Sequence, residues 1–175
     1  MIHVRIKIFL IILTFIVIVF GAYVRLTDAG LGCPDWPGCY GKLVPSGISG
    51  YEGSSEYDAG KAWREMIHRY LAGFLGIGVF GLALYSLRSG KGFRSLELAL
   101  VPLVFFQSIL GMFTVTLLLK PLVVSLHLMG GLAILSVLWW SLIRDLDLKG
   151  SVLKKSGLLK IVGWLAFSAL IVQIF

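Results

Sequence analysis

The chain has 175 residues, of which 58% are hydrophobic and only 14% are charged, a more apolar balance than a soluble domain shows. The net charge of +7 does not indicate a nucleic-acid partner, because the cations cluster at the ends of apolar runs, where lipid headgroups and membrane topology account for them. The composition therefore excludes an ordinary soluble enzyme and a nucleic-acid-binding domain, and it predicts an integral membrane protein.

The first predicted element is a membrane-spanning helix over residues 6–24, with Arg5 and Lys7 at its start. A secretory signal would have a shorter apolar core and a clear small-residue cleavage site, of which Ala22 is only a weak version. We therefore predict a retained first helix. The absence of an Arg- and Ser-rich leader favours a bacterial protein over a mitochondrial precursor.

The polar segment 25–64 follows, and it holds the only two cysteines, Cys33 and Cys39. Two prolines and a glycine between them favour a tight turn, so a disulfide is expected if the segment lies in an oxidising compartment. The bond can be structural, closing a loop over the helix ends, or redox-active through thiol exchange. The structural role is slightly favoured, because the spacing is not the C-x-x-C of thiol oxidoreductases.

The second predicted helix, over residues 66–87, begins next to Glu65 and carries His68. These two side chains are three residues apart, so they share one helical face. Ionisable groups at membrane depth are candidates for function. Glu65 alone can equally be an ordinary polar residue at the membrane interface.

Two further spanning helices are predicted over 96–118 and 122–143, joined by a tight turn. His127 lies six residues after Pro121, which places it about 9 Å along its helix. The third helix also carries polar and small residues on one face. These residues are Gln107, Gly111 and Thr114. They can line a pocket or form hydrogen bonds with a neighbouring helix, and the second interpretation is favoured.

His68 and His127 therefore lie on different helices at matching depth, if both helices enter from the same side. An iron porphyrin standing across a helix bundle needs one imidazole on each side of its ring. Small residues follow both histidines and leave room for a flat macrocycle: Ala72, Gly73, Gly76, Gly130 and Gly131. Such residues also serve plain helix packing, and a single histidine can simply bond to a neighbour. Two at equal depth favour heme ligation, whereas His3 is assigned no role.

The cations predict the orientation. The turns 88–94 and 144–160 are short and rich in Lys and Arg, as is the amino terminus, so all three are expected in the cytoplasm. Segment 25–64, with both cysteines, and the turn at Lys120 are then outside. We expect a multi-pass protein of the bacterial inner membrane.

A fifth apolar segment begins near Leu158 and runs to Phe175 without a cap or interfacial residues. It predicts either a fragment that stops inside a fifth spanning helix or a re-entrant last helix, and the first is favoured. The expected fold is an all-α integral membrane bundle. Residues 1–150 form a four-helix heme-binding half, and residues 151–175 form a linker with an incomplete fifth helix.

Three segments resemble the heme A synthase family, and the resemblance covers most of residues 15–131. A cysteine pair around Pro-Asp-Trp-Pro, then Glu-x-x-His, then Lys-Pro-Leu before a histidine form a specific combination. The segments are GAYVRLTDAGLGCPDWPGCYGKLVP, EMIHRYLAG and QSILGMFTVTLLLKPLVVSLHLMGG.

The resemblance implies an oxidoreductase that converts the C8 methyl of heme O to the formyl group of heme A for terminal oxidases. It implies two four-helix halves, with His68 and His127 as axial ligands to the iron of the substrate heme O. Glu65 would act at the reacting methyl, and Cys33 and Cys39 would form a disulfide. Heme b would be the cofactor of the other half, whose histidine pair this chain lacks, so activity of the chain alone is not implied.

The expected partners are membrane lipid, heme O delivered by heme O synthase, and a homo-oligomer, with no nucleic acid. Two other functions stay open. The chain can be a short cytochrome b-like electron-transfer protein that acts as a dimer. It can also be a quinone-linked membrane disulfide oxidoreductase, although the single cysteine pair and the two deep histidines disfavour that reading.

Overall fold

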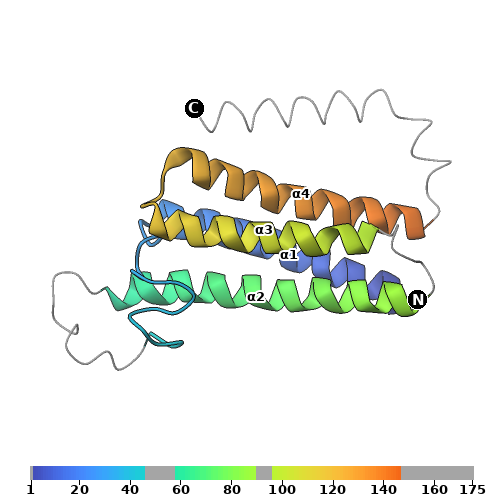
Figure 1. Ribbon diagram of the computed structural model, residues 1–175, viewed down its shortest axis with the longest axis horizontal. Coiled ribbons are helices and arrows are strands. Elements are labelled where there is room, and N and C mark those ends of the chain that lie inside the picture. The colour runs from blue at the N-terminus through green and yellow to red at the C-terminus, as the bar shows by residue number, and fades with distance from the viewer. Residues whose placement is uncertain (1, 46–57, 90–95, 147–175) are drawn as a thin grey trace.

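The computed structural model describes residues 2–45, 58–89 and 96–146. Figure 1 shows four long helices: α1 (Ile2–Leu26), α2 (Ala59–Arg88), α3 (Leu96–Thr116) and α4 (Pro121–Asp145). Each is long and apolar enough to cross a membrane. Even the shortest, with 21 residues, is about 32 Å long, which matches the hydrocarbon core of a bilayer. The predicted all-α membrane fold is confirmed, and the described ranges contain no β-strand.

The helices form a four-sided bundle. α1 packs on α2 and α4, and α3 packs on the same two helices, so that α2 and α4 lie on a diagonal. At one end, here called the loop end, α1 and α3 finish and α2 and α4 begin, and the opposite end carries the amino terminus (Figure 1). Inward side chains of α2 and α4 therefore face each other across the bundle interior.

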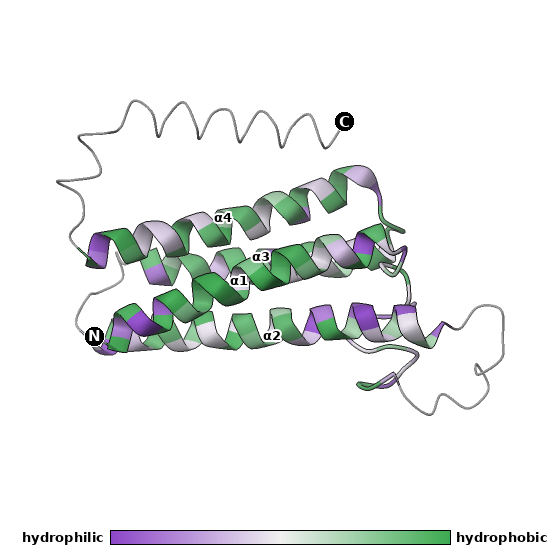
Figure 2. Cartoon of the chain, turned by 180° about the vertical axis from the view of Figure 1, so that it is seen from behind, coloured by the Kyte–Doolittle hydropathy of each residue, from purple (hydrophilic) through white to green (hydrophobic). Residues whose placement is uncertain are grey.

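An apolar layer fills the middle of the bundle. Figure 2 shows hydrophobic residues along the central parts of the helices and hydrophilic residues gathered towards the two ends. The buried members of this layer come from all four helices: Leu10, Leu13, Leu75, Val79, Leu82, Leu100, Ile134 and Leu138. The layer lies between two separate polar clusters, one at each end.

The second helix begins earlier than its apolar pattern predicted. It starts at Ala59 rather than near residue 66, because Asp58 caps it by accepting the Lys61 N–H at 3.0 Å. That bond to the Lys61 N–H is the main cause of a lowered pKa for the Asp58 carboxyl. Hydropathy marks only the lipid-facing length of a helix, so the two added polar turns were not visible in the pattern.

Lys7 lies at the end of the bundle opposite the loop, and it is buried rather than directed at lipid headgroups as a topology signal would be. Its ammonium contacts Glu97 Oε1 of α3 at 2.5 Å and Asp145 Oδ2 of α4 at 2.7 Å. It also donates to the Ser141 hydroxyl, which in turn donates to Glu97 Oε1 at 2.7 Å. One lysine therefore ties three helices together.

His3, which was assigned no role, belongs to the same network. Its Nδ1 lies 2.6 Å from Asp145 Oδ2, and its ring stacks on Tyr85 of α2 at 5.3 Å. His3, Glu97 and Asp145 are close enough together to hold a metal ion, but the Lys7 ammonium already supplies the positive charge between the two carboxylates. We therefore read the cluster as an ion-pair network.

Three expectations fall outside the described residues, wholly or in large part. These are the fifth apolar segment from Leu158 to Phe175, the turn 88–94 beyond residue 89, and the turn 144–160 beyond residue 146. The division of the chain at residue 150 also remains a prediction.

Candidate functional site

The two predicted ligand residues, His68 and His127, lie on the diagonal pair of helices, α2 and α4, in the loop-end half of the bundle. In each ring the Nδ1 atom is buried and has no hydrogen-bond partner within the described part of the chain. Buried polar atoms are normally bonded, so two buried imidazole nitrogens without partners are unusual in a purely structural role.

Glycines on the other two helices make room for these rings. A Cβ atom added to Gly21 of α1 would lie 2.8 Å from His68 Cε1, and one added to Gly111 of α3 would lie 3.3 Å from His127 Cε1. Each imidazole thus packs against the backbone of a neighbouring helix. Of the small residues that sequence reasoning selected, Gly73 faces open space and Gly130 makes room for Gln107.

Replacing Gly21 by alanine is expected to displace the His68 ring, because the new methyl group would overlap Cε1. If the ring binds an iron porphyrin, the affinity of the protein for heme should fall by about tenfold. This is the lower end of the loss seen when residues that orient a metal ligand are changed. Gly81→Ala is the matched control on α2, since nothing lies within 4 Å of its added methyl and it lies further along the helix from His68. Titration of heme into both purified variants measures the effect, and equal affinities would contradict it.

Gln107 links the third helix to the fourth. Its side-chain amide donates to the backbone carbonyl of His127. This is the hydrogen bond between helices that the sequence favours for Gln107. Because that carbonyl can only accept, the amide nitrogen must face it, and Oε1 is left buried without a partner among the described residues. Thr114 bonds within its own helix, to the Gly111 carbonyl at 2.7 Å. Gln107 therefore supports the turn of α4 that carries His127.

Glu65 lies one helical turn before His68, and its side chain is 4% exposed. One carboxylate oxygen pairs with Arg69, and the other accepts the Cys33 N–H at 2.9 Å. Both oxygens are thus already bonded, with partners on the loop side of α2. Nothing in the structure tests the predicted catalytic role of Glu65, which stays a prediction.

Cys33 and Cys39 form the expected disulfide, with Cα atoms 4.7 Å apart. Both residues are fully buried and pack against Ala62 and Met66 of α2. A buried disulfide is poorly placed for exchange with an external thiol, which supports the structural reading and disfavours a disulfide oxidoreductase.

Residues 32–42, here called the disulfide loop, pack against the first turns of α2 (Figure 1). A Cβ atom added to Gly32 would lie 2.5 Å from the backbone of Lys61, so only glycine allows this approach. Arg69, which sequence reasoning did not select, donates to the carbonyls of Asp35 at 2.9 Å, Pro37 at 3.3 Å and Gly38. The signal for it was a cation inside a predicted membrane span, directly after His68.

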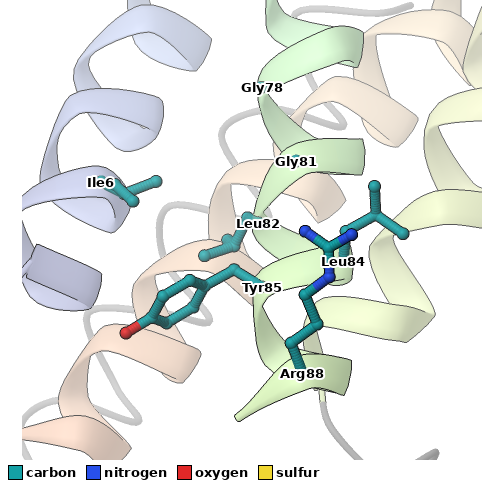
Figure 3. Close-up of a pocket in the computed structure, with 7 residues that line it drawn as sticks. All are labelled: Ile6, Gly78, Gly81, Leu82, Leu84, Tyr85 and Arg88. Atoms are coloured by element: carbon teal, nitrogen blue, oxygen red, sulfur yellow. The ribbon is translucent and has the colours of Figure 1, made fainter.

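One surface groove lies away from His68 and His127. It measures about 500 Å³ between α1 and α2, and Figure 3 shows its lining, which includes Ile6, Gly81, Tyr85 and Arg88 but neither histidine. Apart from Arg88 it offers an apolar, open surface, as expected of a side that faces lipid. We place no chemistry there.

His68 and His127, with the glycines that lie beside them, fit an iron porphyrin. Two imidazoles are the axial ligands that a six-coordinate heme uses, and here they lie on two diagonal helices of one bundle. Their Nδ1 atoms lack the partners that a hydrogen-bonded structural histidine would have. Gly21 and Gly111 leave space for the two rings, because a side chain at either position would crowd the imidazole beside it.

Comparison with known proteins places this sequence in a family. The model of the family COX15-CtaA, cytochrome oxidase assembly protein, matches residues 5–175. A heme A synthase of Shewanella oneidensis is 46% identical over 134 residues, which cover 73% of this chain and 41% of that protein. A heme A synthase of Alkalihalophilus pseudofirmus is 31% identical over 132 residues, covering 71% of this chain and 41% of that protein.

A third relative, a heme A synthase of Exiguobacterium sibiricum, is 34% identical over 116 residues, which cover 64% of this chain and 36% of that protein. The chain thus spans about two fifths of the length of the curated relatives it matches. No solved structure matches it significantly. The family match over nearly the whole chain shows that this is a membrane protein of the COX15-CtaA family.

Proposed function

We propose that the chain acts in heme A synthesis, as an oxidoreductase that holds heme O while its C8 methyl group is converted to a formyl group. The observation that carries this proposal is the pair of histidines on diagonal helices, each with a buried, unpartnered Nδ1. His68 and His127 would be the axial ligands of the heme O iron. The relatives that bear the name heme A synthase support the choice of reaction.

Glu65 is the residue we propose to act at the reacting methyl. A carboxylate one helical turn from an axial ligand can orient water, accept a proton or stabilise positive charge at the porphyrin edge. Its near-complete burial strengthens any such interaction, because water does not screen it. Its partners, Arg69 and the Cys33 N–H, hold it on the loop side of α2.

The disulfide beside the site supports a proposal for which side of the membrane the site lies on. We propose that the loop end faces the outside of a bacterial inner membrane, where the disulfide is stable. Heme O would reach the site from heme O synthase. Heme b is proposed as the resident cofactor of the other four-helix half of a heme A synthase, because the two intramembrane histidines described here, His68 and His127, are assigned to heme O.

The test is pigment extraction from a host that makes heme O but lacks heme A synthase and that produces this protein in its full native form. We expect heme A to appear. Glu65→Gln should retain bound heme O and lower the heme A yield by about 100-fold or more, the usual contribution of a catalytic acid or base. Asp58→Asn is the control, because asparagine also caps helices.

Two outcomes would refute parts of this proposal. Heme A missing from the unmutated strain, with the protein present in its membranes, would remove the reaction. Unchanged heme A in Glu65→Gln would remove the role of the carboxylate. A protein that only carried electrons would bind heme and cycle between redox states equally well with either residue at position 65.

A further inference from the structure

Arg69 joins the disulfide loop to the candidate site. Its guanidinium donates through one nitrogen to loop carbonyls, including those of Asp35 and Gly38, and through the other to Glu65 Oε1. The side chain is only 12% exposed. A guanidinium can serve both sets of acceptors because its donors point in fixed directions from one plane, whereas a lysine ammonium cannot span them.

The helix geometry places Glu65 between two faces of α2. His68 follows it by three residues and Arg69 by four, so the two lie on opposite sides of the direction in which Glu65 points. His68 packs towards Gly21 of α1, whereas Arg69 points to the loop. The carboxylate of Glu65 therefore stands at the border between the loop and the histidine face.

The contacts of Glu65 show what sets its position. Arg69 holds Oε1, and the Cys33 N–H holds Oε2 at 2.9 Å. Both partners lie on the loop side of α2. The contact between the loop and α2 is closely packed there, since Met66, which packs with the two cysteines, is 1% exposed. Without Arg69, the hydrogen bonds left to the carboxylate among the described residues would come from the loop backbone, chiefly from the Cys33 N–H.

We propose that Arg69 is a positioning residue for Glu65, and that the Arg69–Glu65 pair makes the docked disulfide loop part of the reacting site. The inference rests on the proposed function, in which Glu65 acts on the methyl group of heme O. It assigns Arg69 no contact with the porphyrin. The alternative is that Arg69 only anchors the loop through its carbonyls, with no effect on Glu65.

Hydrogen exchange of the loop amides separates these two roles without any measurement of activity. The Cys33 N–H is bonded to Glu65, so loss of a positioning residue should expose this amide alone, whereas loss of a pure anchor would loosen the whole loop and expose the Tyr40 and Gly41 amides as well. We expect Arg69→Gln to speed its exchange by about fivefold or more, the net effect of losing one hydrogen bond. The Tyr40 and Gly41 amides, which bond to Asp35 within the loop, should stay protected and serve as internal controls.

Activity gives the second readout in the full native protein. Arg69→Gln should lower the heme A formed per bound heme O by about tenfold or more while leaving heme O affinity within about twofold, because a displaced group costs rate rather than binding. Arg69→Lys keeps the charge and should recover part of the rate. Arg64→Gln is the matched control on the same helix, since within the described ranges Arg64 donates a hydrogen bond to the Gly60 carbonyl of its own turn.

The proposal is overturned if the Cys33 amide stays protected in Arg69→Gln, or if Arg64→Gln exposes the same amide. It is also overturned if heme O affinity falls as far as the rate does, which would indicate general damage. Thiol labelling confirms that the disulfide of each variant is intact. An unmutated protein that makes no heme A would refute the proposed reaction, while the Cys33 amide would still decide whether Arg69 positions Glu65.

Discussion

Replacing Lys7 by methionine is expected to lower the free energy of unfolding by about 3–5 kcal/mol, the usual result of removing one partner of a buried ion pair. The lysine is fully buried, and it contacts carboxylates from two other helices, Glu97 and Asp145. Methionine fills a similar volume, so the loss would come from removing the ammonium between two carboxylates rather than from a cavity. Denaturant titration in detergent micelles would measure it.

Two further variants make this test specific. Arg5→Met removes an exposed cation from the same helix and should change the free energy of unfolding by less than about 0.5 kcal/mol. Adding Glu97→Gln and Asp145→Asn to Lys7→Met should restore most of the loss, because the cluster is then uncharged but still able to form hydrogen bonds. Equal effects of Lys7→Met and Arg5→Met would show that the network contributes no stability.

Replacing either His68 or His127 by alanine is expected to remove most of the bound heme O. Disturbing only the outer support of a metal ligand costs about 10–100-fold in affinity, so loss of the ligand itself should cost more. The two single variants should be similar and the double variant little worse, since one remaining imidazole cannot hold the iron from both sides. Heme per protein, measured on the purified chain, reports the result.

His3→Gln is the control for these variants, because it removes the third histidine, at the opposite end of the bundle. Glutamine can still bond to Asp145, so the ion-pair network should survive. Heme content should stay as in the unmutated chain. If all three histidine variants lost heme equally, general destabilisation would explain the loss better than ligation.

Much of the membrane fold could be predicted from the sequence, because hydropathy is a local property. Four spans, and the turn before Pro121, are visible as apolar runs and their interruptions. The start of α2 was misplaced because polar turns outside the lipid carry no hydropathy signal, and only the cap at Asp58 marks the boundary. The disulfide was predictable from composition and turn chemistry, since the chain has one cysteine pair.

What escaped prediction depends on which helices become neighbours. Lys7 looks like a topology signal until Glu97 and Asp145 are known to pack beside it. Gly21 becomes meaningful only when α1 lies against His68. Arg69 becomes meaningful only when the loop folds back over α2. Each of these contacts joins residues far apart in sequence, which periodicity within one helix cannot reveal.

The central claim is that His68 and His127 together bind the iron of one heme O. Electron paramagnetic resonance of the unmutated chain loaded with ferric heme O, in which the histidines carry an isotopic nitrogen label, tests this claim most directly. The account predicts a low-spin iron with two coordinated histidine nitrogens, reduced to one in His68→Ala and in His127→Ala. A high-spin iron, or a single histidine ligand in the unmutated chain, would contradict it.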